Sequence, residues 1–188
     1  MGIRKIFNNK EFPMKNKIKG SVWVIRDTDG NPINDIDTDM IFHNKHLAIT
    51  ELSEMAKYAF GNLDGWKDFP QKVQNGDILI VGENFGAGSS RQQAVDCFIA
   101  LGIQTIVGES FGAIYFRNTV NAGLPIFIAP KIADSDIKTG DEIEINLDSG
   151  KIFDITQNIE LPSAKPLTDV QRQIMSAGEL LKLAQKMR

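Results

Sequence analysis

Three apolar segments in the middle of the chain limit its fold more than any other feature. They are rich in Ile, Val and Leu, do not alternate with polar residues, and are separated by segments of helix length. Strands of this kind joined by helices are typical of βαβ units, in which a parallel sheet is covered on both faces. We therefore predict strands at "DILIVG" (77–82), "IQTIVGES" (103–110) and "LPIFIA" (124–129), with helices over 89–102 and 111–123 that end at Gly102 and Gly123.

A β-rich flank is expected around this parallel core. Polarity alternates on both sides of "DSGK", which is typical of a hairpin. No repeat or low-complexity segment interrupts the pattern, so we expect a single domain over 17–188, preceded by an arm at 1–16. The remaining expected elements are a strand at 19–27, an amphipathic helix at 50–62 with Thr50 as N-cap, the hairpin at 141–155, and a final helix at 168–188 opened by Thr168 with Gly178 as its weak point.

Composition excludes several classes of protein. The chain has 188 residues, 42% of them hydrophobic, which is enough for a sizeable core without disulfides. Its formal net charge of −3 argues against a nucleic-acid binder. A single cysteine, Cys97, excludes an internal disulfide and an iron–sulfur site built by this chain alone. No apolar run reaches the ~18 residues of a membrane span. We expect a cytoplasmic protein.

The segment "GENFGAGSSRQQA" (82–94) joins the first of the three core strands to its helix. Open α/β sheets bind ligands at such strand ends. Ser89 is expected to cap the helix, with Gln92 completing a capping box, so that free N–H groups and the helix dipole attract an anion. Arg91 adds a planar fork suited to carboxylate or phosphate. The turn therefore predicts a site for a negatively charged ligand.

Two nucleotide-binding motifs come close to this turn without matching it. A phosphate-binding loop needs a lysine after its glycines, and none stands here. A dinucleotide fingerprint needs a third glycine where Arg91 stands. From spacing alone, an anion site and a capped helix start with no ligand remain equally open interpretations.

Three motifs together resemble a known family. "DIDTDMI" (35–41), "NFGAGSSRQQA" (84–94) and "SFGAIYFRNTVNAGLP" (110–125) occur in the order found in the small subunit of 3-isopropylmalate dehydratase, the same module as the swivelling β/β/α domain of aconitase. The resemblance implies a hydro-lyase that isomerises a 2-hydroxy acid by dehydration and rehydration. It also implies a large-subunit partner carrying a four-iron four-sulfur cluster, with no cofactor in this chain and no nucleic acid or membrane as partner.

The resemblance also assigns roles to residues. Ser89 corresponds to the base of the family and Arg91 to its carboxylate-binding arginine; Asp39 corresponds to a residue that orients catalytic or substrate groups. Gly88, Ser90 and Thr38 are expected to contact substrate. The turn departs from the family where Ala87 replaces a frequent cysteine and where Gln92 and Gln93 replace Glu-His or Glu-Gln. These changes leave the serine and the arginine in place.

The expected substrate follows from the segment "HLAIT" (46–50). In the resemblance it senses the variable group of the substrate, and Ala48 stands where an arginine serves when that group ends in a carboxylate. Since alanine pairs no charge, an alkyl group is favoured, as in 3-isopropylmalate and leucine biosynthesis. Alternatives are a citramalate, 2,3-dimethylmalate or homoaconitate substrate, because His46 replaces the usual tyrosine and Lys45 is nearby. A stand-alone phosphate- or nucleotide-binding module and a non-catalytic scaffold are the other hypotheses.

The remaining polar residues have simpler interpretations. The alternating Asp35, Asp37 and Asp39 lack the downstream glutamate of a calcium loop, and His43 and His46 lack zinc-binding partners, so no metal site is expected. We expect Cys97 to act as a small buried hydrophobic residue and the polar side chains of the family motifs to bond locally or meet solvent. Those polar residues are Asn84, Ser110, Arg117 and Asn118.

Overall fold

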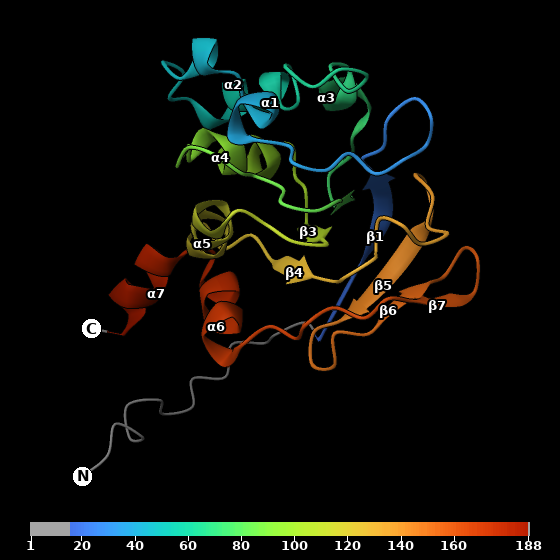
Figure 1. Cartoon of the computed structure of the whole chain (residues 1–188). Helices are drawn as coiled ribbons and strands as arrows, with labels where there is room; N and C mark the ends of the chain where they lie inside the picture. The colour runs from blue at the N-terminus through green and yellow to red at the C-terminus, as the bar shows by residue number, and fades with distance from the viewer. Residues whose placement is uncertain (1–15, 188) are drawn as a thin grey trace.

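The computed structural model describes residues 16–187. All but the last residue of the arm expected at 1–16 lies outside this range. The strands of the described chain form one sheet in the order β4-β3-β2-β1-β5-β6-β7 (Figure 1). The bounds are β1 Lys17–Val24, β2 Ile78–Val81, β3 Thr105–Gly108, β4 Ile126–Ile128, β5 Glu142–Asn146, β6 Ile152–Asp154 and β7 Ile159–Leu161.

The parallel half of the sheet confirms the expected βαβ core. β1 to β4 are parallel neighbours, and α4 (Gln93–Ala100) and α5 (Ala113–Asn121) make the crossovers. Successive residues of β2 face opposite ways. Leu79 and Val81 pack with the helices in one core, whereas Ile78 and Ile80 belong to a second core. Both faces of β2 are therefore buried, which explains why its sequence shows no alternation.

The antiparallel half closes over the second core. β5 and β6 form the predicted hairpin, and β7 adds a third strand that the sequence pattern did not indicate. Ile143 and Ile145 of β5 pack with the second core, while Glu142, Glu144 and Asn146, which alternate with them, are more exposed. The second face of the parallel strands is thus covered largely by this β-rich flank and its loops, not by helices.

The helix predicted at 50–62 is wrong in its extent. One turn of α-helix, α2 (Leu52–Met55), is followed by a 3-10 turn at Ala56–Tyr58, and the N-cap is Glu51, not Thr50. The chain then turns so that Phe60, at φ 56°, is fully buried in the aromatic core. Burial of this ring outweighs the local preference for a continuing helix. The other short elements are α1 Thr38–Ile41, η2 Asn44–His46 and α3 Phe69–Lys72.

The final segment begins as predicted and then breaks. Thr168 and Gln171 form a capping box at the start of α6 (Asp169–Ala177). Gly178, with a φ of 89°, ends α6, and α7 (Leu180–Lys186) follows in a new direction. The backbone of Gly178 lies close to Gly123: a Cβ added to Gly123 would be 2.2 Å from the carbonyl oxygen of Gly178. The predicted continuous helix is therefore two helices that pack around the end of α5.

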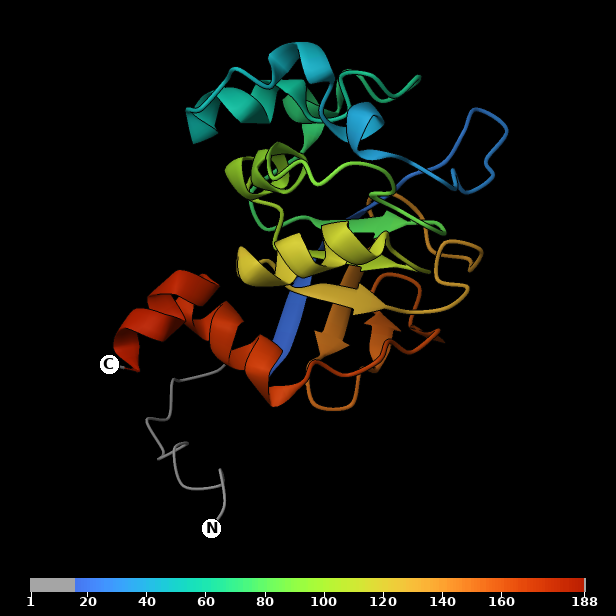
Figure 2. The same ribbon diagram turned by 60° about the vertical axis from the view of Figure 1, so that its left-hand side comes forward.

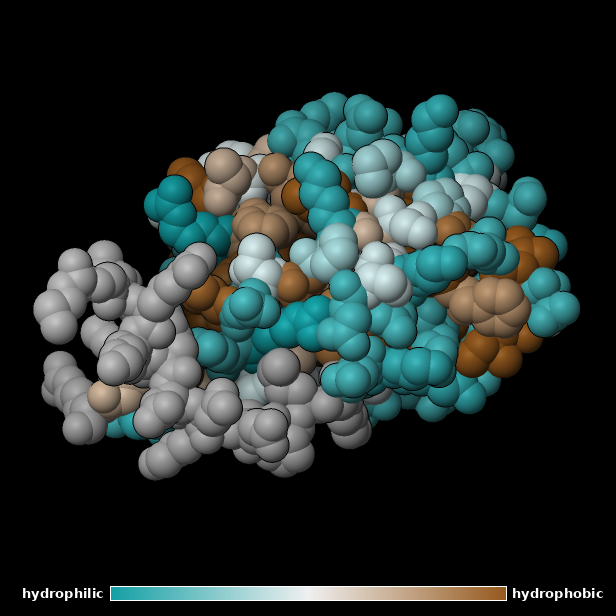
Figure 3. Space-filling view, turned by 90° about the horizontal axis from the view of Figure 1, so that it is seen from below, coloured by the Kyte–Doolittle hydropathy of each residue, from teal (hydrophilic) through white to brown (hydrophobic). Residues whose placement is uncertain are grey.

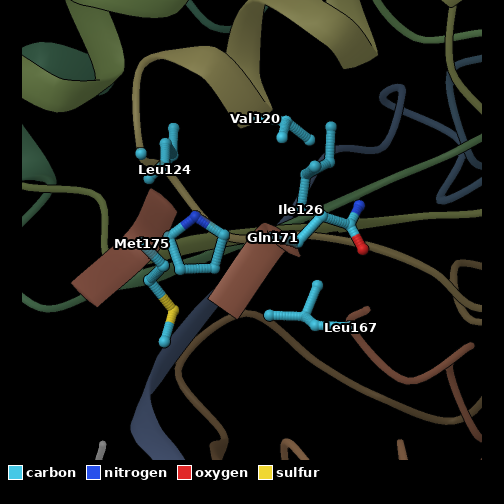
Figure 4. Close-up of a pocket in the computed structure, with 8 residues that line it drawn as sticks. Val120, Leu124, Ile126, Leu167, Gln171 and Met175 are labelled. Atoms are coloured by element: carbon cyan, nitrogen blue, oxygen red, sulfur yellow. The ribbon is translucent and has the colours of Figure 1, made fainter. Parts of the chain in front are cut away.

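Two hollows lie beside α5. One is a cavity of about 10 Å³, roughly one water-sized sphere, lined by apolar side chains and Gln171 (Figure 4). The second, of about 480 Å³, is more open and is lined by aromatic and aliphatic residues with Arg117 at its side. Seen from below, the coloured surface is mainly hydrophilic, with hydrophobic residues in separate patches (Figure 3). In the part of the chain that the structure describes, no helix has the length and apolar character needed to cross a bilayer.

Candidate active site

The three motifs that carry the family resemblance meet at one edge of the sheet. Residues 36–38 run beside 85–87, since Gly86 N–H donates to the Ile36 carbonyl at 2.7 Å and Thr38 N–H to the Ala87 carbonyl at 2.9 Å. Residues 85 and 111 form a second bridge. Figure 2 shows the parallel strands pointing toward this edge. Segments far apart in sequence therefore form one backbone platform at the carboxyl end of the sheet.

Glycine is required in this platform by close backbone approach. Gly86 has a φ of 75°, and a Cβ added to it would lie 2.2 Å from Cγ of the Tyr115 ring. A Cβ on Gly112 would lie 2.6 Å from the Gly86 carbonyl oxygen. At Gly88, with a φ of 92°, an added Cβ would be in ordinary contact with Thr38 Oγ1 at 3.7 Å, so its conformation, not crowding, favours glycine. The glycines thus allow the turn to pack against α5 and then reverse toward Ser89.

The helix start predicted at Ser89 is wrong. α4 begins at Gln93, and its N-cap, Gln92, makes no capping hydrogen bond; the Gln92 side chain bonds within α4 instead. Arg91 N–H donates to the Ser89 carbonyl at 2.9 Å, so these residues form a turn. The field of a helix N-terminus falls off within its first turn. The helix therefore supplies Ser89 with less stabilisation of negative charge than the sequence predicted.

Ser89 is exposed, and its hydroxyl has a partner. Oγ of Ser89 lies 3.1 Å from Oγ1 of Thr38, a residue that is only 2% exposed. Gly88 lies next to Thr38, and Ser90 is exposed beside Ser89. The structure thus brings together all four of these predicted site residues.

Arg91 is held by the acidic segment. Its Nη1 donates to Asp39 Oδ1 at 2.5 Å and to the Phe42 carbonyl at 3.1 Å. Asp39 also accepts from the Asn44 N–H at 3.0 Å and from the Asn62 amide at 3.1 Å. Burial alone raises the pKa of Asp39, but the hydrogen bond from Arg91, the Asn44 N–H and the arginine charge together lower it. Asp39 is therefore an ionised anchor for the guanidinium.

Within residues 16–187 the Arg91 side chain forms two hydrogen bonds, both from Nη1. Its Nε and Nη2 make no hydrogen bond within these residues, and the guanidinium is held from the Nη1 side. Sequence analysis missed the Phe42 carbonyl and Asn62 in this arrangement. No local pattern marks them, because each lies in a separate turn that approaches Arg91 or Asp39 only through the fold.

The loop at 46–50, which contains Ala48, lies beside the start of α4. His46 stacks on Tyr58 with ring centroids 3.8 Å apart, and burial lowers the pKa of His46. The Gln93 amide donates to the Leu47 carbonyl at 3.4 Å, which ties the loop to the start of α4. Ala48 is exposed at the end of this loop. No hydrogen bond joins Ala48 to Ser89 among the described residues.

Comparison with known proteins identifies the family. Residues 65–131 match the model of the aconitase C-terminal domain. The 3-isopropylmalate dehydratase small subunit of Thermodesulfovibrio yellowstonii is 38% identical over 90% of this chain and 95% of that protein. The isopropylmalate/citramalate isomerase small subunit of Methanocaldococcus jannaschii is 36% identical over 92% and 96%. The chain belongs to the 3-isopropylmalate dehydratase small-subunit family.

The fold agrees with that membership. The crystal structure of 3-isopropylmalate dehydratase from Methanocaldococcus jannaschii superimposes with a TM-score of 0.78 at 35% identity, covering 90% of this chain and 94% of that one. The predicted α/β class, with the aconitase-type swivelling domain as its pattern, is therefore confirmed.

The other family-motif residues behave as predicted where the contacts can be read. Asn84 N–H donates to Ser110 Oγ at 2.8 Å, and its side-chain amide donates to Asp35 at 2.8 Å, so these are local loop bonds. Cys97 is fully buried, and burial raises the pKa of its thiol. Its thiolate is therefore not available as a ligand. Within residues 16–187 no three His, Cys, Asp or Glu side chains are grouped as a metal site requires.

Proposed function

We propose that this chain is the small subunit of a hydro-lyase that isomerises a 2-hydroxy dicarboxylic acid of the 3-isopropylmalate type, in leucine biosynthesis, together with a large subunit. The observation that carries the proposal is the exposed Ser89 hydroxyl beside the fixed Arg91–Asp39 pair on a platform built from the three family motifs. Membership of the family supports it. We also propose that residues 17–188 form one domain after an arm at 1–16, and that the protein works in the cytoplasm.

The roles of the site residues follow from charge. Loss of a proton from the carbon beside a carboxylate builds up negative charge on the substrate, which a fixed cation stabilises. Arg91 would bind that carboxylate through Nε and Nη2. Asp39 would hold the guanidinium by accepting a hydrogen bond from Nη1. Ser89, as the alkoxide, would take the proton and become a neutral hydroxyl. On rehydration the same hydroxyl would return a proton to the neighbouring carbon.

Departure of the substrate hydroxyl needs a Lewis acid, which a four-iron four-sulfur cluster on the large subunit would supply. The residues of this chain are consistent with a cluster that is held by the large subunit alone. Cys97 is fully buried in the core, and burial raises the pKa of its thiol, so it offers no thiolate to a cluster. The large subunit would therefore hold the cluster, while this chain would bind the substrate and remove its proton.

The loop that contains Ala48 supports an alkyl side group on the substrate. Ala48 carries no charge, and a carboxylate placed against it would lose its water without gaining a partner. The exposed Leu47 and Leu52 nearby in the sequence also favour an apolar group. Isopropyl or methyl groups fit this description better than the carboxylate of homoaconitate.

The alternative of a stand-alone phosphate- or nucleotide-binding module is not favoured. The turn has neither the lysine of a phosphate-binding loop nor the third glycine of a dinucleotide fingerprint. The relatives that match nearly the whole chain are named as small subunits of dehydratases or isomerases.

Reconstitution tests the proposal. The chain is mixed with its cognate large subunit, and formation of the unsaturated acid from 3-isopropylmalate is followed by ultraviolet absorbance, with citramalate, 2,3-dimethylmalate and homoaconitate as competing substrates. We expect turnover only with both subunits, and preference for an alkyl-substituted acid. Ser89→Ala should lower kcat by at least about a thousandfold, since it removes the base.

Ser163→Ala, an exposed loop serine outside the site, is the matched control and should keep full activity. Binding of both variants to the large subunit is measured by size-exclusion chromatography. Unchanged turnover by the Ser89→Ala complex would remove Ser89 from the mechanism. A rise in melting temperature with nucleotide, and none with malate-type acids, would favour the phosphate-binding alternative.

A further inference from the structure

The hydroxyl of Thr38 stands out because it is buried and yet faces the reacting residue. Thr38 is 2% exposed, and its Oγ1 lies 3.1 Å from Ser89 Oγ. Within residues 16–187 this is the hydrogen bond that the Thr38 side chain makes. A buried hydroxyl without a partner is costly, so the contact with Ser89 satisfies a group that the fold has placed there.

The backbone that carries Thr38 is held in place by hydrogen bonds. Its N–H donates to the Ala87 carbonyl at 2.9 Å, and its carbonyl accepts from the Phe42 N–H at 3.0 Å. Asp37 caps α1 by accepting from two N–H groups at 2.8 Å, which sets the turn in which Thr38 lies. Threonine is also β-branched and stiff about χ1. The direction of the Thr38 hydroxyl is thus determined by the platform and not by solvent.

Ser89, in contrast, has little to fix its side chain. It is exposed, it follows Gly88 in a turn, and it precedes the start of α4 by four residues. An unbranched serine has three staggered positions available about χ1. A hydrogen bond from a rigid neighbour selects one of them.

We propose that Thr38 is a positioning residue that orients the Ser89 oxygen and donates a hydrogen bond to it when Ser89 is the alkoxide. This inference rests on the proposed function. It differs from a substrate contact, because the Thr38 side chain is buried and its hydroxyl is engaged by Ser89. The Thr38 hydroxyl would also stabilise the Ser89 alkoxide, which lies outside the first turn of α4. A hydrogen bond to a charged oxygen is stronger than one to a neutral oxygen.

The test uses the complex of this chain with its large subunit. Thr38→Val keeps the shape of the side chain but removes the donor. We expect kcat to fall about ten- to hundredfold, the range for losing a hydrogen bond to a charged group, while KM stays within about twofold. The primary deuterium isotope effect on kcat should rise for substrate labelled at the carbon that loses its proton, because that step becomes slower. Thr38→Ser should restore most of the rate.

Thr119→Val is the matched control. Thr119 is fully buried in α5, where its hydroxyl donates to the Tyr115 carbonyl at 2.8 Å, so the same substitution removes a hydroxyl away from the site. It should leave kcat and the isotope effect unchanged. A Thr38→Val complex that keeps its rate, that loses activity through KM alone, or that Thr38→Ser does not rescue would overturn the inference. Inactivity of Ser89→Ala combined with full activity of Thr38→Val would overturn this inference alone. Full activity of Ser89→Ala would remove Ser89 from the mechanism and this inference with it, whereas absence of turnover by the unchanged complex would overturn the proposed function.

Discussion

At the scale of single residues, charge at the site is arranged by pairing. Asp39 accepts hydrogen bonds from Arg91, Asn44 and Asn62, and its pKa lies below the ordinary value of an aspartic acid. A group with a lowered pKa in the folded state contributes stability that is present above its unfolded pKa and is lost as pH falls through the folded pKa. The pair with Arg91 is therefore intact at neutral pH and weakens only in acid.

Replacement of Arg91 tests what this pairing provides. Arg91→Lys keeps the charge but loses the planar fork, so one side can no longer bind Asp39 while the other binds a substrate carboxylate. We expect kcat/KM of the reconstituted complex to fall about ten- to hundredfold, chiefly through KM. Steady-state kinetics with 3-isopropylmalate measure this.

Arg172→Lys provides the control, because Arg172 also pairs with a carboxylate, Asp148, and with a backbone carbonyl, that of Leu147, but belongs to α6. Its kinetics should match those of the unchanged complex. An Arg91→Lys complex with an unaltered KM would contradict the assigned role.

At the scale of elements, the turn at 82–91 behaves as a structural unit, not as a helix extension. It is wedged between residues 36–38 and the start of α5, and Tyr115 of α5 packs against Gly86 with its ring fully buried. Two further bonds fix its position, from Phe85 N–H to the Ser110 carbonyl and from Gly112 N–H to the Phe85 carbonyl. The position of Ser89 therefore depends on packing three residues earlier.

Substitution of alanine at Gly86 should reveal this dependence. The left-handed backbone costs an alanine about 1–2 kcal/mol, and the clash of its Cβ with the Tyr115 ring adds about 1–3 kcal/mol. For a chain of this size each kcal/mol lowers the melting temperature by about 2–4 °C. Thermal unfolding of the isolated chain, followed by circular dichroism, measures the loss.

Gly88→Ala is the comparison, since Gly88 has a similar φ but its nearest atom, Thr38 Oγ1, would be 3.7 Å from the new Cβ. Its free energy of unfolding should fall only by the cost of placing alanine in the left-handed backbone conformation, without the cost of a clash. Equal melting temperatures for the two variants would show that contact with Tyr115 does not constrain the turn.

At the scale of the whole molecule, the parallel strands lie between two cores of different character. The core under the helices is rich in aromatic rings, with Phe98 of α4 at 5.1 Å from Phe60 and 6.3 Å from Phe85 between ring centroids. The core under the antiparallel strands is mainly aliphatic. The aromatic core joins α4, the turn before it and the loop around residue 60, which are the segments that surround the site.

Removal of a central ring should destabilise the molecule as a whole. Phe98→Ala is expected to lower the free energy of unfolding by about 3–5 kcal/mol, because the side chain is fully buried and leaves a cavity. Phe153→Ala, on the outer side of β6 and 40% exposed, should change it by no more than about 0.5 kcal/mol. Urea titration of the isolated chains measures both, and a loss at Phe98 below about 1 kcal/mol would contradict this view of the core.

The amino-acid sequence alone indicated the features that depend on near neighbours. Doubly buried strands such as Ile78–Val81 reveal themselves by the absence of alternation, and the cap at Thr168 by the glutamine three positions later. Gly178 was recognised as a weak point for the same reason, because a glycine inside a helical pattern is costly whatever surrounds it. The family motifs also identified the segments of the candidate site in advance.

Other features were decided only when distant segments met. α4 begins at Gln93 and not at Ser89 because Arg91 turns toward Asp39, and Ser89 lies beside Thr38, 51 positions earlier in the chain. The helix expected at 50–62 gives way because Phe60 is buried in the aromatic core. Propensity and periodicity report on residues within a turn or two of one another, whereas these contacts are set by strand order and by which side chains the two cores enclose.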